Sequence, residues 1–128
     1  MPASQAPLKV FLADDSSQIR SRVAAMLRDV TTIVGEAETP HGCIEGILST
    51  RPDVVVLDVQ LDGGQGLEVL SAVRALQPRI QFVVFSNNAG AAYRKRYLSA
   101  GAARFLDKSS EFGELTGAVV AAFNLQLH

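Results

Sequence analysis

Five polar side chains stand at the ends of apolar, strand-like stretches in this sequence. They are Asp14 and Asp15 after LKVFLA, Asp58 after VVVL, Ser86 at the end of IQFVVFS, and Lys108 at the end of AARFLDK. Three carboxylates that converge repel one another unless a cation joins them, and a site with few oxygen ligands suits Mg²⁺ or Mn²⁺. A lysine balances the remaining charge, and metal, lysine and hydroxyl together suit phosphoryl transfer.

Asp58 is the best placed of the three acids to act as a nucleophile. It follows the apolar residues 54–57, which are typical of a strand buried on both faces, where an unpaired ionised acid is costly. The small, polar segment DGGQG that comes soon after leaves space above it. Because carboxylates serve as nucleophiles in aspartyl-phosphate chemistry, we expect Asp58 to accept a phosphoryl group.

Apolar stretches alternate with segments of helical periodicity along the chain. This order, (βα)₅, predicts an α/β domain with a doubly wound, five-stranded parallel sheet, in which ligands bind at the carboxyl ends of the strands. The predicted strands cover residues 8–13, 31–37, 53–58, 80–86 and 102–108. The apolar faces of the helices run over residues 19–30, 44–48, 67–76, 91–101 and 115–123.

Capping residues mark the ends of several helices. Ser16 or Ser17 is expected to cap the first helix, Pro40 to lie in the first turn of the second, and Gly101 to end the fourth. The last helix is expected to use Ser109 or Ser110 as its cap, with Glu111 in its first turn.

Composition narrows the class of protein. A chain of 128 residues with 48% hydrophobic residues fits one globular domain, here 8–128, after a loose tail at 1–7. A net charge of −1 gives no sign of direct binding to nucleic acid, and the single cysteine, Cys43, allows no internal disulfide. The sequence contains no signal peptide and no run long enough to enter a membrane, so a cytoplasmic location is expected.

The sequence resembles the receiver domain of two-component response regulators over residues 8–124. The motifs FLADDS, VVVLDVQLDGGQGLEVL, VVFSN and ARFLDKS carry the resemblance. It implies the flavodoxin-like strand order 2-1-3-4-5 and phosphorylation of Asp58 by a sensor histidine kinase or a phosphotransfer protein. It also implies that Asp15 binds the metal directly, Asp14 through water, and Gln60 through its backbone carbonyl.

The resemblance implies further roles around the acceptor. Ser86 and Lys108 would contact the phosphoryl oxygens, and Phe105 would be the switch aromatic that enters from outside when Ser86 moves. Gln60 and Asn88 would tune the lifetime of the acyl phosphate. The alternative for Phe105 is a plain core phenylalanine.

The expected output face consists of the fourth helix, the fifth strand and the fifth helix. Tyr93, Arg94 and Tyr97 are its candidates, and the alternative is a solvated basic helix with one tyrosine packed inward. A downstream protein would bind there, and the kinase would dock near the first helix, around Gln18 and Arg22. We expect a monomer or a phosphorylation-linked dimer. The protein would assist its own phosphorylation without being a turnover enzyme. It would act either as a single-domain regulator or as part of a longer protein.

Three positions depart from the family pattern. Asp62 stands where proline is usual, which predicts a more mobile and acidic loop, Asn87 replaces a small residue, and Ser109 replaces proline. Asp62 and Asn87 keep open the alternative of a degenerate receiver that binds partners without phosphate. A magnesium-dependent phosphatase with an aspartyl nucleophile usually carries a D-x-D motif after its first strand, and a flavin protein has a loop rich in Ser, Thr and Gly there. The segment ADDSSQ matches neither.

Overall fold

The computed structural model describes residues 8–126, so the predicted tail at 1–7 lies outside the described residues. At its centre is a five-stranded sheet in the order β2-β1-β3-β6-β7, and every neighbouring pair is parallel. Since β6 and β7 are the fourth and fifth strands of this sheet along the chain, the predicted order 2-1-3-4-5 is confirmed. The strands are β1 (Leu8–Ala13), β2 (Thr31–Ala37), β3 (Val54–Leu57), β6 (Gln81–Ser86) and β7 (Arg104–Asp107).

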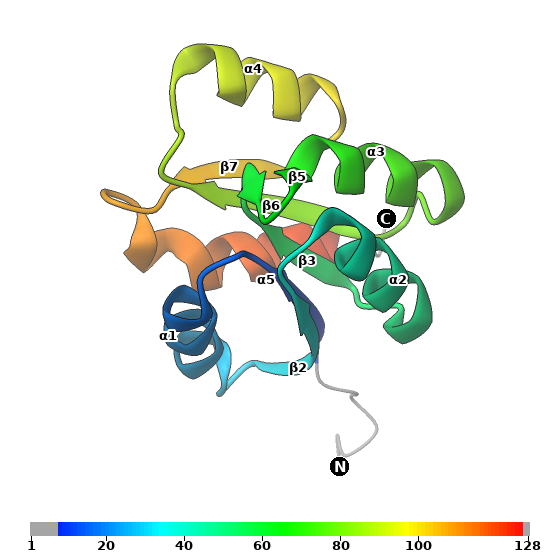
Figure 1. The fold of residues 1–128 in the computed structure, drawn as a ribbon. Helices are drawn as coiled ribbons and strands as arrows, with labels where there is room; N and C mark the ends of the chain where they lie inside the picture. The colour runs from blue at the N-terminus through cyan, green and yellow to red at the C-terminus, as the bar shows by residue number, and fades with distance from the viewer. Residues whose placement is uncertain (1–7, 127–128) are drawn as a thin grey trace.

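Helices cover both faces of the sheet (Figure 1). Helices α1 and α5 pack on one face, and α2, α3 and α4 pack on the other. Val54 and Val56 of β3 face the first group while Val55 and Leu57 face the second, which explains the uninterrupted apolar run. The helices are α1 (Ser17–Leu27), α2 (Pro40–Thr50), α3 (Gly66–Leu76), α4 (Ala91–Ser99) and α5 (Leu115–Gln126), with a 3₁₀ turn, η2 (Phe112–Glu114), before α5.

The caps of the first, second and fourth helices agree with the prediction. The side chain of Ser16 accepts a hydrogen bond from the amide of Ile19, and the side chain of Thr39 caps α2 with Pro40 in its first turn. Gly101 follows α4 with a φ of +113°, a conformation that suits glycine.

The predicted start of the last helix is wrong. The carboxylate of Asp107 accepts hydrogen bonds from both the amide and the hydroxyl of Ser109, and neither Ser109 nor Ser110 caps a helix. Glu111 precedes the 3₁₀ turn instead of lying in the first turn of α5. The hydroxyl of Ser109 is thus hydrogen-bonded to Asp107 and does not cap the helix.

The apolar faces of two helices were predicted to be longer than they are. Val30 lies beyond the end of α1 and is 44% exposed, Met26 is 37% exposed, and Leu76 at the end of α3 is 63% exposed. Periodicity gives the direction of a face, but it does not indicate where the supporting sheet ends.

A short antiparallel hairpin lies between β3 and α3, where a mobile loop was expected. Its strands are β4 (Gln60–Leu61) and β5 (Gly64–Gln65). The turn residues are Asp62 and Gly63, of which only Gly63 has positive φ, and the amide of Asp62 donates to the carbonyl of Glu38. The segment after β3 is thus paired with itself and hydrogen-bonded to the residue that follows β2.

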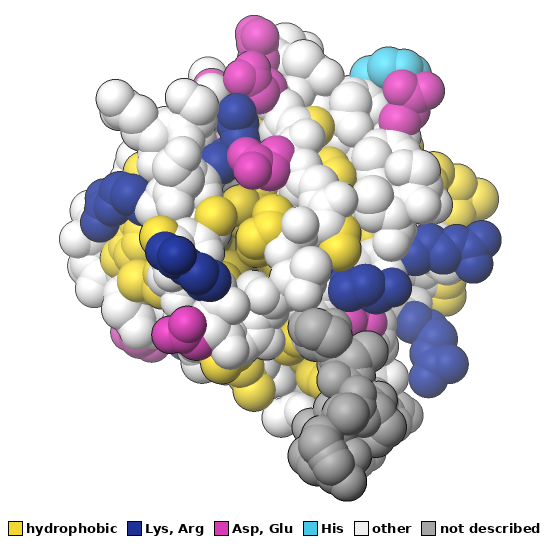
Figure 2. Space-filling model, turned by 90° about the horizontal axis from the view of Figure 1, so that it is seen from below, with side chains coloured by type: hydrophobic (Ala, Val, Ile, Leu, Met, Phe, Trp, Pro, Cys, Tyr) yellow, Lys and Arg dark blue, Asp and Glu magenta, His cyan; other side chains and the backbone are white. Residues whose placement is uncertain are grey.

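The surface carries charges of both signs. In the view of Figure 2, hydrophobic side chains reach the surface between Lys, Arg, Asp and Glu side chains, and no single sign covers this face. Within residues 8–126, none of the helices combines the length and the apolar character needed to cross a membrane.

Candidate functional site

The structure brings the acid at the end of β3 together with the predicted lysine. Asp58 is 8% exposed, and its amide donates to the carbonyl of Ala13 in the neighbouring strand. The Nζ of Lys108 lies 3.0 Å from Oδ2 of Asp58 and 2.7 Å from Oδ2 of Asp14. A buried ammonium group therefore bridges two buried carboxylates, and Asp58 is not an unpaired charge.

Three carboxylates meet at the carboxyl end of the sheet. Asp14, Asp15 and Asp58 each offer an oxygen atom, and these atoms lie within 4.8 Å of one another. Asp14 is buried and its Oδ1 accepts from the amide of Ser16, whereas Asp15 is exposed. Clustered carboxylate oxygens with an open side form the kind of donor set that holds a small divalent cation.

Burial and charge act in opposite directions on this cluster. Burial raises the pKa of Asp14, although the hydrogen bond from Lys108 partly offsets the effect. Burial alone would lower the pKa of Lys108, but the hydrogen bonds and charges of Asp14 and Asp58 outweigh it, so the pKa of Lys108 is raised. The ammonium group is therefore charged at neutral pH and balances part of the acidic cluster.

Ser86 ends the adjacent strand β6 on the same edge of the sheet. Its side chain is buried, and its Oγ accepts a hydrogen bond from the amide of Asn88 at 3.0 Å. Its backbone carbonyl accepts from the amide of Lys108 at 3.1 Å. The predicted hydroxyl and the predicted lysine are thus joined through the backbone.

Phe105 lies inward, beneath α4. It is 4% exposed, and its ring makes an edge-to-face contact with Tyr97, with the ring centroids 6.0 Å apart. The structure therefore shows Phe105 in the environment of a core phenylalanine, and its role as the switch aromatic stays a prediction. Tyr97 is 1% exposed, and its hydroxyl accepts from the amide of Leu67 in α3. The placement of Tyr97 on the output surface is consequently wrong.

The other two candidates on α4 lie in different environments. Tyr93 is 38% exposed. Arg94 is half-buried, and its guanidinium donates to the backbone carbonyls of Ala89 and Phe105 and to the carboxylate of Glu111. It also lies over the ring of Phe105, 5.2 Å from the centroid. Arg94 is therefore an internal connector rather than a free surface charge.

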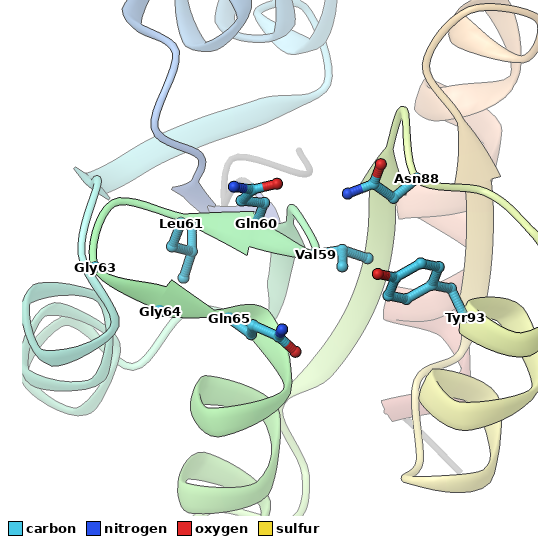
Figure 3. Close-up of a pocket in the computed structure, with 8 residues that line it drawn as sticks. All are labelled: Val59, Gln60, Leu61, Gly63, Gly64, Gln65, Asn88 and Tyr93. Atoms are coloured by element: carbon cyan, nitrogen blue, oxygen red, sulfur yellow. The ribbon is translucent and has the colours of Figure 1, made fainter.

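A cavity of about 430 Å³ opens along the segment that follows Asp58. Figure 3 shows the hairpin residues on one side and Asn88 and Tyr93 on the other. Val59 and Gln60, which follow Asp58 directly, line it together with Gln65. The sequence pointed to Gln60 and Asn88 but not to the cavity, because the hairpin that forms one wall was not predicted.

The sequence of the chain matches the model of one protein family over most of its length. The response regulator receiver domain matches residues 10–120. The chain belongs to this family. Membership supports the receiver interpretation over the phosphatase and the flavin protein, and it places the domain among those of two-component systems.

Known relatives of this receiver domain include longer proteins. Response regulator GacA of Pseudomonas aeruginosa is 30% identical over 118 residues, which are 91% of this chain and 55% of that protein. A protein-glutamate methylesterase/protein-glutamine glutaminase of Idiomarina loihiensis is 32% identical over 108 residues, 81% of this chain and 28% of that protein. The receiver domain thus spans about half or less of these curated relatives.

A solved structure agrees with the fold of the receiver domain. The signal receiver domain of the putative response regulator NarL from Mycobacterium tuberculosis has a TM-score of 0.87 and 30% sequence identity to it. The similarity covers 94% of this chain and 98% of that chain. The described residues therefore have the architecture of a receiver domain throughout.

Proposed function

We propose that this receiver domain is a phosphorylation-dependent switch that accepts a phosphoryl group on Asp58. The observation that carries the proposal is the convergence of Lys108, Asp14 and Asp15 on this carboxylate. The donor is the phosphohistidine of a sensor histidine kinase or of a phosphotransfer protein. A cytoplasmic location belongs to the same proposal.

In the proposed reaction, a carboxylate oxygen of Asp58 attacks phosphorus and the phosphorus–nitrogen bond of the donor breaks. The imidazole of the donor leaves with the bonding electron pair and takes up a proton. Lys108, already at hydrogen-bond distance from Asp58, then donates to a phosphoryl oxygen. The chain supports its own modification in this way, without a separate turnover reaction.

The residues of the acidic cluster fit Mg²⁺ or Mn²⁺. Asp15, Asp58 and the carbonyl of Gln60 would hold the ion directly, and Asp14 through water. When bound, the ion supplies positive charge that balances the phosphoryl oxygens. The cavity beside Gln60 and Asn88 gives the donor room to approach.

The proposed signal leaves the site through Ser86. Its hydroxyl, which accepts from the amide of Asn88, would move and donate to a phosphoryl oxygen, because phosphorylation adds charge and strong acceptors. Ala89 follows three residues after Ser86, and its backbone carbonyl accepts a hydrogen bond from Arg94. The guanidinium of Arg94 also lies over the ring of Phe105. A downstream protein would therefore respond at the face formed by α4, β7 and α5, as a partner of a monomer or of a phosphorylation-linked dimer.

The test is intact mass after incubation with Mg²⁺ and a small phosphodonor or a cognate kinase. We expect one added phosphoryl group in the wild type, none in Asp58→Asn, and much slower labelling in Asp15→Asn. The variant Asp29→Asn, an exposed acid outside the cluster, is the control and should behave as wild type. Labelling of Asp58→Asn at another residue would reject the acceptor, and no labelling of the wild type by any donor would leave the degenerate receiver as the better description.

A further inference from the structure

Arg20 of α1 reaches back to the acidic edge of the sheet. Its side chain is 12% exposed, and its Nη1 donates to the backbone carbonyl of Asp14 at 2.6 Å. Its Nε lies 2.8 Å from Oε1 of Glu36, and its Nη2 lies 3.5 Å from Oε1 of Glu38. One nearly buried guanidinium therefore contacts the β1–α1 loop and both acids that flank Ala37.

These contacts join three segments of the site. The amide of Asp14 donates to the carbonyl of Ala37 at 3.2 Å, and the amide of Asp62 in the hairpin donates to the carbonyl of Glu38 at 2.8 Å. The loop with the acids, the end of β2 and the hairpin after Asp58 thus meet around Arg20. A planar guanidinium that donates in several directions at once fixes such an arrangement better than a single ammonium group.

The contact with the Asp14 carbonyl matters most for Asp15. That carbonyl belongs to the peptide plane between the two acids, so its orientation sets the direction in which Asp15 leaves the backbone. Asp15 is exposed, and among the described residues its side chain has no hydrogen bond that could orient it instead. The backbone is therefore the main determinant of where this carboxylate lies.

We propose that Arg20 is a positioning residue for the divalent cation, acting through the backbone of Asp14 and Asp15. This inference rests on the proposed function, since it deepens the metal site of that function. Groups that orient ligands from outside the coordination sphere commonly change metal affinity about 10-fold or more when they are replaced. We expect an effect of about that size here.

Two roles of Arg20 predict opposite changes in Mg²⁺ affinity when the residue is replaced, so the direction of the change distinguishes them. The positive charge of Arg20 repels a cation, so a purely electrostatic role predicts tighter binding when the charge is removed. A positioning role predicts weaker binding. Arg20→Lys keeps the charge but loses the planar fork, whereas Arg20→Gln loses both, so the two variants separate these effects.

The experiment is a Mg²⁺ titration of the unphosphorylated protein followed by amide NMR. The amide of Ser16, which donates to Oδ1 of Asp14, is a direct reporter of the acid loop. We expect the Kd for Mg²⁺ to rise about 10-fold in both Arg20→Lys and Arg20→Gln. Arg28→Gln is the matched control, because Arg28 is an exposed arginine at the end of the same helix, and its Kd should stay that of wild type.

The proposal is overturned if Arg20→Gln binds Mg²⁺ as tightly as wild type or more tightly, or if Arg20→Lys leaves the Kd unchanged. Loss of stability with an unchanged Kd would show a merely structural role. If both variants unfold, Glu36→Gln removes the ion pair that holds Arg20 and leaves the aspartates of the cluster unchanged. An unchanged Kd in that variant also overturns the proposal. Wild type that binds no Mg²⁺ at all would instead refute the metal site of the proposed function.

Discussion

At the scale of single residues, Lys108 holds the acidic cluster together. Its ammonium group is bound by Asp14 and Asp58, and all three side chains are nearly buried. Removing one partner of such a group leaves uncompensated buried charge, which is far more costly than the intact group is stabilising. The lysine therefore stabilises the fold by supplying the counter-charge of two buried carboxylates.

Lys108→Met is expected to lower the free energy of unfolding by about 3 kcal/mol at pH 7, because two buried carboxylates lose their counter-charge. The pKa of Lys108 is raised in the folded state, so its contribution is complete below the ordinary value of 10.5 and is lost as the pH rises through the folded value. In the variant, the penalty also shrinks as acid protonates Asp14, whose pKa is raised by burial. Urea unfolding across pH measures both limits.

Lys95→Met, which removes an exposed lysine of α4, is the control for this series. It should change stability little at any pH. A pH-independent loss in Lys108→Met equal to that of Lys95→Met would contradict the counter-charge role of Lys108.

At the scale of elements, α4 is held to the sheet by polar contacts rather than by a broad apolar face. Tyr97 is its only buried residue, whereas Arg94 binds the loop before the helix, strand β7 and Glu111. The carboxylate of Glu111 also accepts from the amide of Asp107, next to Lys108. Helix α4 is therefore connected by hydrogen bonds to the loop after Ser86 and to the segment around Lys108, the two segments that would carry the signal.

We expect Arg94→Gln to destabilise the protein by about 1–2 kcal/mol, since three hydrogen bonds and a partly shielded cation–π contact are lost. Arg104→Gln breaks a comparable ion pair, Arg104 to Glu114 at 3.1 Å, but that pair is exposed. It should cost less than about 0.5 kcal/mol. Chemical denaturation of both variants gives the comparison, and equal losses would show that Arg94 is an ordinary surface residue.

At the scale of the whole molecule, much of the architecture could be predicted from sequence because buried strands and helices differ strongly in pattern. The edge that gathers Asp14, Asp58, Ser86 and Lys108 followed from the alternation of strands and helices, whereas the strand order followed from the family resemblance. Features that depend on distant partners could not be predicted. The sequence left open which tyrosine packs inward, and the choice of Tyr97 depends on the amide of Leu67 in another helix.

Two further failures have the same origin. The hairpin strands contain two residues each, too few to show any periodicity, although the pair Asp62–Gly63 is a usual turn signal. Arg20 was overlooked because its partners are a backbone carbonyl and two acids far along the chain. Neither the pairing of two-residue strands nor the long-range contacts of Arg20 can be recognised from the spacing of residues along the sequence.

At the proposed metal site, Mg²⁺ should stabilise the entire domain, because it would bind a carboxylate arrangement that exists only in the folded state. At about 100 times its Kd, the expected gain is about 2.7 kcal/mol, visible as a higher Tm. Asp15→Asn and Asp58→Asn should reduce the gain, while Asp29→Asn should retain it. A gain that is equal in all variants would mean that the ion binds elsewhere.

The hydrogen bond from Leu67 to the hydroxyl of Tyr97 has a practical consequence for optical spectroscopy. The chain contains no tryptophan and only two tyrosines, so its near-ultraviolet signal comes mainly from Tyr93 and Tyr97. The phenol of Tyr93 lines the cavity, and that of Tyr97 is enclosed between α3 and β7, where burial raises its pKa. Tyrosine absorbance and fluorescence quenching of the unlabelled protein can therefore report separately on the cavity, through Tyr93, and on the packing of α4 against the sheet, through Tyr97.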